Sequence, residues 1–326
     1  MIRFLVRAAA AVAMALCVLA PIAAGAQAWP TKPVKFIVPY PPGGSTDPMA
    51  RLIAVKLSDS LGQPFVVENR SGASGTIGTA FVAKSPADGY TFIFVFDYHA
   101  VNPFLIPNLP FDTVKDLAPV TLIGTAPMAI ATAAGKPYKS FTDVVAAANA
   151  KPGTVSIGSV GNGSLGHLTM VLVQQASRIR LIHIPYKGGG PMTADAVGGQ
   201  IDLAIGSVAV IAPHVKGGKL RAIAVTGDTR SRALPDVPAL AEQGLPGFSA
   251  LAWWAVFAPA GVPKPVMDKF HAELVKAFNL PDVRKLLTET LGIDLVVSPP
   301  EGLAQWLETQ MQRWGTVVRE NNIRAD

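Results

Sequence analysis

The sequence predicts an α/β fold made of two lobes, with a ligand cleft and a hinge between them. Strand-like and helix-like patterns alternate along almost the whole chain, as they do in folds built mainly on parallel strands. The 326 residues, of which 50% are hydrophobic, exceed the usual size of one domain and suffice for two cores. No low-complexity linker divides the chain, which favours two lobes joined by short crossings.

Residues 1–28 have the pattern of an export signal. Two arginines precede an uncharged run, residues 8–24, and Ala26-Gln27-Ala28 supplies the small residues of a cleavage site. We therefore predict a signal peptide that is cleaved after about Ala28. The alternatives are an uncleaved membrane anchor and a lipoprotein attached at Cys17. The run is marginal in length for a bilayer span, and the bulky Leu16 precedes the cysteine.

Cysteine usage and charge narrow the class of protein further. Cys17 is the only cysteine, so the mature chain can form neither a disulfide nor a thiolate zinc site. An exported chain with this composition is typical of the bacterial periplasm. The net charge of +6 is spread along the chain without a lysine or arginine run, which argues against nucleic-acid binding.

The first lobe is expected to contain residues 29–126 and 252–326. Its first helix is the clearest, because Met49, Ile53 and Leu57 recur every four residues, as on one helix face. In chain order we predict strand 35–38, helix 49–61, strand 65–68, helix 77–84, strand 91–96, strand 253–257 and helices 265–278, 282–291 and 301–319.

The second lobe is expected to contain residues 127–251. Its first helix follows a capping box, in which Ser140 and Asp143 satisfy the N–H groups at the helix start. After that helix, 141–150, we predict strand 154–160, helix 165–176 and strands 179–186, 201–205 and 220–225. The segment that follows Arg230 is rich in turn residues.

The joint between the first strand and the first helix is unusually rich in glycine and in helix-capping residues. Gly43 and Gly44 permit positive φ angles and a close approach of another molecule. Ser45, Thr46 and Asp47 are all suited to cap a helix. The N–H groups at a helix start lack internal partners, and the helix dipole adds partial positive charge there. The joint is therefore either a well-capped turn or a site for a carboxylate or phosphate.

A second glycine-rich joint precedes the helix predicted at 165–176. Gly161, Gly163 and Gly166 match G-x-G-x-x-G, but no acidic residue follows before Asp195 to hold a ribose, which argues against a dinucleotide site. Ser164 lacks the preceding glycine of a nucleophile elbow. A second anion-accepting helix start is the better interpretation.

Other catalytic patterns are weak. The five histidines show no metal-ligand spacing, so we expect no metal and no cofactor. His167 lies in the first turn after the second glycine loop and is the histidine most suited to face a cleft.

Several stretches together resemble the Bug (TctC) family, the periplasmic substrate-binding proteins of tripartite tricarboxylate transporters. Among them are WPTKPVKFIVPYPPGGSTDPMARLIA, VVENRSGASGTIGTAFVAKSPADGYTFIF, GNGSLGHL and IPYKGGGPMTADAVGGQIDLAIG. The matching stretches cover nearly all of the mature chain in the family's order. The resemblance implies a type II periplasmic-binding-protein fold, whose lobes close on a small carboxylated solute for delivery to membrane permease subunits.

The resemblance also implies where the solute lies, between the first glycine joint and the second. Asp97 and Tyr98 depart from the small polar residues usual in the family, and Gly206 and Ser207 stand where an aspartate and a polar residue are common. The implied ligand-binding residues are Tyr40, Gly43, Gly44, Ser45, Thr46, Asp47, Asp97, Tyr98, His99, Ser159, Gly161, Asn162, Gly163, Ser164, His167, Gly206 and Ser207.

We therefore expect a monomeric, non-enzymatic capture protein for a small organic acid. A receptor that signals to a sensor protein would have the same fold, so this alternative stays open. An exported enzyme using Asp97, His99 or His167 as a base would need a nucleophile or metal that the sequence does not show. If Asp97 faces the cleft it disfavours a second carboxylate, and Tyr98 favours an aromatic body. A monocarboxylate, or an aromatic or amino-bearing acid, is then expected rather than citrate.

Overall fold

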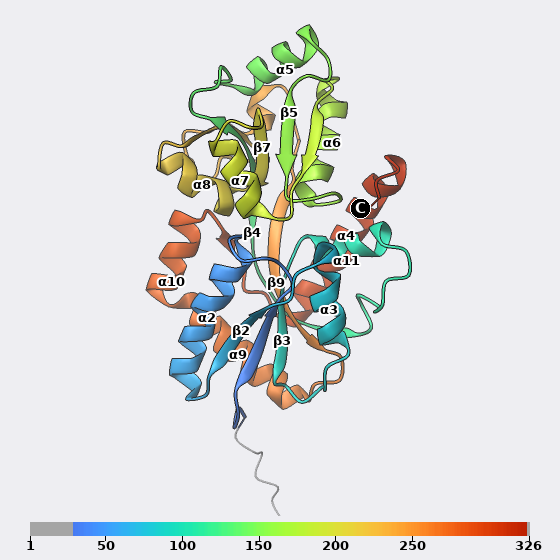
Figure 1. The fold of residues 1–326 in the computed structure, drawn as a ribbon. Coiled ribbons are helices and arrows are strands. Elements are labelled where there is room, and N and C mark those ends of the chain that lie inside the picture. Colours follow the sequence, from blue (N-terminus) through green and yellow to red (C-terminus); the bar gives the residue numbers. More distant parts are fainter. Residues whose placement is uncertain (1–28, 325–326) are drawn as a thin grey trace, which may run out of the picture. The chain divides into compact units, whose positions relative to one another are not determined.

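The computed structural model describes residues 29–324 and confirms the predicted α/β fold class (Figure 1). The chain divides into two units, Met1–Thr31 and Lys32–Asp326, and the helices and strands of the described residues lie in the second. The predicted signal peptide, residues 1–28, lies outside the described residues. Within 29–324, no helix has both the length and the apolar character needed to span a bilayer.

The strands form a ten-stranded sheet in the order β2-β1-β3-β9-β4-β7-β5-β6, with β8 and β10 also paired to β4. We call β1, β2, β3, β9, β10 and the first part of β4 sheet A, and β5 to β8 with the last part of β4 sheet B. The bounds are β1 (Val34–Val38), β2 (Phe65–Asn69), β3 (Thr91–Phe96), β4 (Leu117–Ala133), β5 (Ser156–Ser159), β6 (Ile182–Pro185), β7 (Leu203–Ser207), β8 (Leu220–Val225), β9 (Leu251–Pro259) and β10 (Asp294–Leu295).

The direction of the central strands differs from the mainly parallel sheet that the sequence predicts. β1 pairs in parallel with β2 and β3, as β5 does with β6 and β7. β4 and β9 run antiparallel to every strand they pair with. Periodicity reports burial and not strand direction, so the prediction is wrong at the centre of the sheet. The sequence also does not predict β4 itself.

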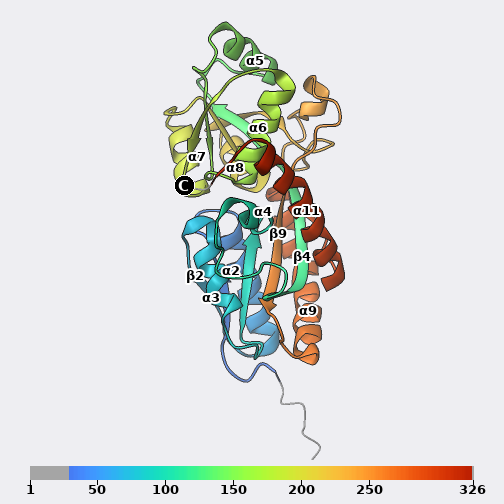
Figure 2. The ribbon, with the colours of Figure 1, turned by 90° about the vertical axis from the view of Figure 1, so that its right-hand side faces the viewer.

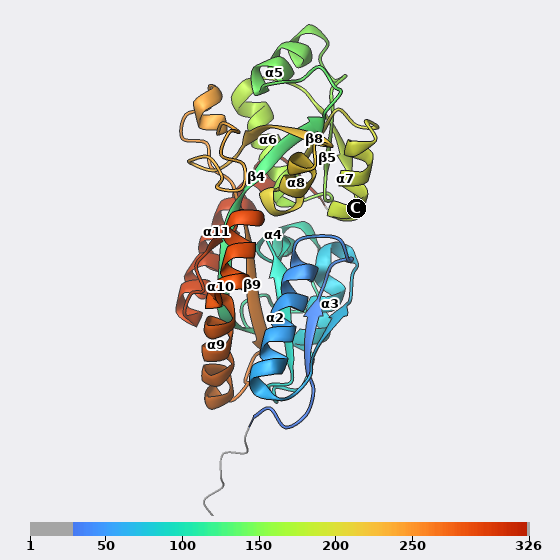
Figure 3. The ribbon, with the colours of Figure 1, turned by 90° about the vertical axis from the view of Figure 1, so that its left-hand side faces the viewer.

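The helices pack on both parts of the sheet. With sheet A lie α2 (Thr46–Leu61), α3 (Thr76–Ala83), α4 (Tyr98–Leu105), α9 (Lys264–Asn279), α10 (Pro281–Lys285) and α11 (Pro300–Glu320). With sheet B lie α5 (Phe141–Ala150), α6 (Leu165–Ser177), α7 (Gly189–Val197) and α8 (Val208–Lys216). Figure 2 shows α4 next to α11, and Figure 3 shows α2 next to α9, in agreement with their contacts. The sequence does not predict α4, α7 or α8.

Each part of the sheet has its own apolar core. Trp253 and Leu303 belong to the cluster on sheet A, and Met192 and Ile211 to the cluster on sheet B. Burial of one such side chain contributes about 1.5–3 kcal/mol. Two cores are consistent with two lobes, but the predicted lobe boundaries remain a prediction.

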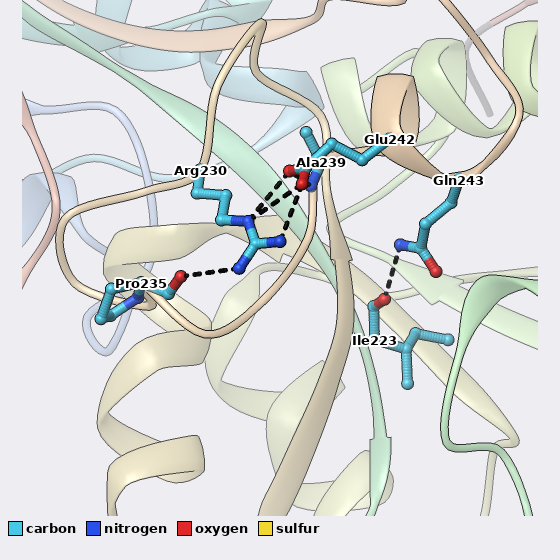
Figure 4. Close-up of polar contacts among 6 residues, drawn as sticks. All are labelled: Ile223, Arg230, Pro235, Ala239, Glu242 and Gln243. Atoms are coloured by element: carbon cyan, nitrogen blue, oxygen red, sulfur yellow. Dashed lines mark hydrogen bonds and ion pairs between the residues drawn. The ribbon is translucent and has the colours of Figure 1, made fainter.

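The segment between β8 and β9 has little regular structure, and an ion pair between Arg230 and Glu242 helps to hold it (Figure 4). The Arg230 guanidinium donates to both carboxylate oxygens of Glu242 at 2.8–3.2 Å. This contact lowers the pKa of Glu242 to about 2. Glu242 also accepts a hydrogen bond from the Ala239 N–H at 2.9 Å. The adjacent Gln243 side chain donates to the Ile223 carbonyl of β8 at 3.0 Å, which fastens this segment to sheet B.

Thr226, which directly follows β8, connects β4 to Ala250, the residue before β9. Its hydroxyl accepts a hydrogen bond from the Met128 N–H at 2.9 Å and donates to the Ala250 carbonyl at 2.6 Å. Its backbone adds bonds to the same two residues. The Thr226 side chain is fully buried, so water cannot replace these bonds.

We predict that Thr226→Val lowers the free energy of unfolding by about 1–3 kcal/mol, because it leaves two buried backbone groups without their side-chain partner. Urea denaturation measures the change. Thr316→Val is the control, since the Thr316 hydroxyl donates to the Gln312 carbonyl on the exposed face of α11. Equal effects of the two substitutions would contradict the role assigned to Thr226.

Candidate ligand-binding site

A cavity of about 60 Å³ lies where sheet A, sheet B and several helix starts come together. Larger surface hollows of about 600 and 680 Å³ occur elsewhere, but none of the predicted ligand-binding residues lines them. The cavity is lined by Tyr40, Ser45, Thr46, Phe96, Tyr98, Met128, Val160, Gly189, Ser207 and Val210. It is therefore the place where the sequence prediction and the structure agree.

Three helices begin at this cavity. α2 begins at Thr46, α7 at Gly189, and α8 directly after Ser207. None of the three has a side-chain cap. Each helix start presents N–H groups without intrahelical partners and carries partial positive charge. None of the ten lining residues carries a formal charge. The arrangement can thus bind an anion with helix starts alone.

Two serine hydroxyls stand at these helix starts. The Ser45 hydroxyl accepts a hydrogen bond from Trp254 Nε1 at 3.0 Å, which leaves its own hydrogen available to donate. Ser207 is 2% exposed, and its hydroxyl has no hydrogen-bond partner. A buried hydroxyl without a partner is costly, so Ser207 is poised to donate to a bound group.

Two tyrosine rings form an aromatic wall. Tyr40 stacks on Tyr98 with ring centroids 6.3 Å apart, and its hydroxyl accepts a hydrogen bond from the Phe96 N–H at 3.0 Å. The Tyr98 hydroxyl donates to the Val160 carbonyl at 3.1 Å. A Cβ on Gly161 would lie 2.5 Å from that hydroxyl, so the contact requires glycine there. Tyr98, next to sheet A, is thereby bonded to the loop after β5 of sheet B.

The first glycine joint also reaches sheet B. A Cβ on Gly43 would lie 3.9 Å from Gly190 Cα, and a Cβ on Gly189 would lie the same distance from Gly44 Cα. The two glycine-rich loops therefore approach each other with almost no side chain between them. Gly43 also has a φ of +92°, which L side chains rarely adopt, whereas a Cβ on Gly44 would meet no atom within 4 Å.

The polar groups of the second glycine joint bond to one another and to neighbouring residues of the protein. Ser164 caps α6, because its hydroxyl accepts a hydrogen bond from the His167 N–H at 3.2 Å. The His167 Nδ1 accepts from the Gly163 N–H at 3.0 Å, and its ring stacks on His183 with centroids 4.0 Å apart. Ser159 Oγ lies 2.7 Å from His183 Nε2. The Ser164 hydroxyl thus caps the backbone of His167 at the start of α6.

Asp97 lies beside the cavity in a buried position. It is 1% exposed, and neither carboxyl oxygen has a hydrogen-bond partner of good geometry. Burial raises the pKa of Asp97 well above its ordinary value, while the nearby N–H groups of Leu165 and Tyr98 oppose this rise. The Asp97 carboxyl therefore faces the start of α6, where the sequence prediction places a second ligand contact.

Two other predicted residues point away from the cavity. Asp47 forms an ion pair with Arg51 at 3.0 Å and accepts a hydrogen bond from Asn69 at 2.8 Å. His99 packs on Phe257, with ring centroids 4.6 Å apart, and burial lowers its pKa to about 3. His99 is accordingly a neutral core residue. Within residues 29–324, no cluster of three His, Cys, Asp or Glu side chains is arranged to hold a metal.

The structure brings together five of the predicted residues as cavity lining, namely Tyr40, Ser45, Thr46, Tyr98 and Ser207. The others lie nearby or behind the wall and do not line it, namely Gly43, Gly44, Asp47, Asp97, His99, Ser159, Gly161, Asn162, Gly163, Ser164, His167 and Gly206. The prediction misses Phe96, Met128, Val160, Gly189 and Val210. The glycine run 188–190 followed by Pro191 is the signal that could have revealed the α7 start.

We predict that Asp97→Asn stabilises the protein increasingly as the pH rises. The folded chain holds the Asp97 proton more tightly than the unfolded chain, so wild-type stability falls as the pH rises above about 4. Urea midpoints of both proteins between pH 4.5 and about 8 test this.

Asp282→Asn provides a control, because its effect on stability should depend on pH in the opposite direction. Lys56 lowers the pKa of Asp282 through a hydrogen bond, so its stabilising effect is present at neutral pH and is lost as the pH falls. An advantage of Asp97→Asn that stays constant or shrinks with rising pH would mean that the Asp97 carboxyl is ionised and stabilised in the folded protein.

Comparison with known proteins places the chain in a family. The model of the tripartite tricarboxylate transporter family receptor, TctC, matches residues 49–323. Protein BugT of Bordetella pertussis (strain Tohama I) is 37% identical over 309 residues, 94% of each chain. The structure of Rpa4515 of R. palustris with adipate shares 32% identity at a TM-score of 0.86, covering 91% of this chain and 99% of that one. MatC of Rhodopseudomonas palustris with bound malate shares 32% identity at a TM-score of 0.81, covering 89% and 100%. The chain therefore belongs to the TctC family of tripartite tricarboxylate transporter receptors.

Proposed function

We propose that this protein is a periplasmic solute-binding protein that captures a small carboxylate and delivers it to the permease of a tripartite tricarboxylate-type transporter. One observation carries the proposal: three uncapped helix starts meet at a cavity that contains an unpartnered serine hydroxyl and no charged side chain. A carboxylate satisfies the free N–H groups, the Ser207 hydroxyl and the helix dipoles together.

The family relatives support the chemical class of the solute. Adipate and malate, which are bound to Rpa4515 and MatC, both carry carboxylates. A fold shared with these relatives would not by itself identify the ligand. The local chemistry of the cavity points to the same functional group, which is why the proposal rests on the site.

Both proposed lobes contribute residues to the cavity wall, and the capture mechanism follows from this. Residues 29–126 with 252–326 act as one lobe and residues 127–251 as the other, with β4 and β9 as the hinge. The solute binds the helix starts of both lobes, so it favours the arrangement in which they meet. Tyr98 and Val160 add a direct hydrogen bond between the lobes in that arrangement.

The remaining parts of the proposal concern location and partners. Residues 1–28 direct export and are cleaved after about Ala28, so the mature monomer works in the periplasm. Its partner is the membrane permease of the transporter. The alternative is that it signals to a sensor protein. It acts as a binding protein and not as an enzyme, in keeping with its family of transporter receptors.

We predict that Ser207→Ala weakens carboxylate binding about 10- to 100-fold, because a hydrogen bond to a charged group is worth about 1.5–3 kcal/mol. Isothermal titration against a panel of mono- and dicarboxylates measures the affinity. Ser60→Ala is the matched control, since Ser60 is exposed at the far end of α2.

The same titrations decide between binding and catalysis. NMR spectra of each bound acid, recorded before and after long incubation with the protein, should be identical. If no carboxylate binds, or if a bound acid is converted, the proposed function is wrong.

A further inference from the structure

The chemistry of the cavity wall allows a narrower statement about the solute. The donors without a protein acceptor come from the helix starts, at Ser45, Thr46, Gly189 and Ser207. The rest of the wall is apolar or aromatic, namely Phe96, Met128, Val160, Val210 and the rings of Tyr40 and Tyr98. The wall therefore offers polar partners for one anionic group and apolar contact for what is attached to it.

The two tyrosine hydroxyls do not add donors for a second anion. The Tyr98 hydroxyl donates to the Val160 carbonyl at 3.1 Å. The Tyr40 hydroxyl lies between the N–H and the carbonyl of Phe96, at 3.0 and 3.4 Å. A ligand group that recruited either hydroxyl would have to break a bond within the protein.

A fourth helix start in this region, that of α6, does not line the cavity. Ser164 caps α6, and none of residues 164–166 belongs to the cavity wall. A second carboxylate of the solute therefore has no helix start left to bind. Asp97 does not line the cavity, and neither does any lysine or arginine.

We propose that the solute is a small monocarboxylate whose body carries no second charge. This inference rests on the proposed carboxylate-binding function. A second ionised group would be buried against an apolar wall without a partner, which costs several kcal/mol per ion. An amino group gains nothing either, because Asp97 does not line the cavity. The amino-bearing acid that the sequence left open is thus disfavoured.

The size of the cavity points to a short chain. A volume of about 60 Å³ holds roughly four to six water-sized groups, at about 10–15 Å³ for each. Propanoate and butanoate are of this size, whereas an aromatic acid needs a wider opening between the lobes.

Isothermal titration with matched pairs of acids tests the inference. Butanoate is compared with succinate, pentanoate with glutarate and hexanoate with adipate, and 4-aminobutanoate is added as a zwitterion. We expect the monocarboxylate of at least one pair to bind ten-fold or more tightly than its dicarboxylate partner. If dicarboxylates bind equally or better, this inference is overturned while the proposed function stands. If no carboxylate of either kind binds, both are overturned.

A gain-of-function variant provides a second readout. Val210→Arg places a cation at the cavity wall and should tighten succinate or glutarate binding at least ten-fold relative to the unaltered protein. Val55→Arg is the control, because Val55 is 58% exposed on α2 and does not line the cavity. Circular dichroism confirms that both variants fold. Dicarboxylate binding that is already tight and is unchanged by Val210→Arg would show that a second charge has a partner elsewhere in the wall.

Discussion

The meeting of three helix N-termini at one small cavity is the constraint on which the rest of this structure depends. Each start carries about half a positive charge, so α2, α7 and α8 together can offset one carboxylate without any cationic side chain. The loops that precede α2 and α7 lie side by side there, since a Cβ on Gly43 or Gly189 would be in ordinary van der Waals contact with the other loop, at 3.9 Å. The lining between these helix starts carries no charged side chain.

The burial of Asp97 belongs to the same electrostatic arrangement. A carboxyl that is 1% exposed favours its protonated form, so it faces the start of α6 without adding a full negative charge beside the cavity. Ser164 caps α6, and His167 contacts Gly163 and His183 beside it. None of residues 164–166 lines the cavity, so the proposed carboxylate site uses the three other helix starts.

How much the sequence predicts depends on whether the signal is local. The joint at residues 40–47 is predicted correctly because glycines and capping residues mark a helix start wherever it lies in the fold. The start of α8 leaves no such mark, since Ser207 is followed by the apolar run 208–212, which has no clear helical period. The direction of β4 and β9 and the inward position of Met128 come from pairing between distant segments. The second glycine joint has the local signals of a binding loop, yet its tertiary neighbours take up its polar groups.

In the proposed capture mechanism, closure of the lobes links the size of the solute to the stability of the bound state. The Tyr98 hydroxyl reaches the Val160 carbonyl only if the loop after β5 lies close, with Gly161 directly beneath the hydroxyl. A solute that holds the lobes further apart loses this bond, which is worth about 0.5–1.5 kcal/mol, and loses apolar contact with Val160 and Val210 as well. A solute that fits keeps both and binds the closed arrangement preferentially. Selection by size therefore does not need a rigid wall, because the free energy of closure already penalises the larger acid.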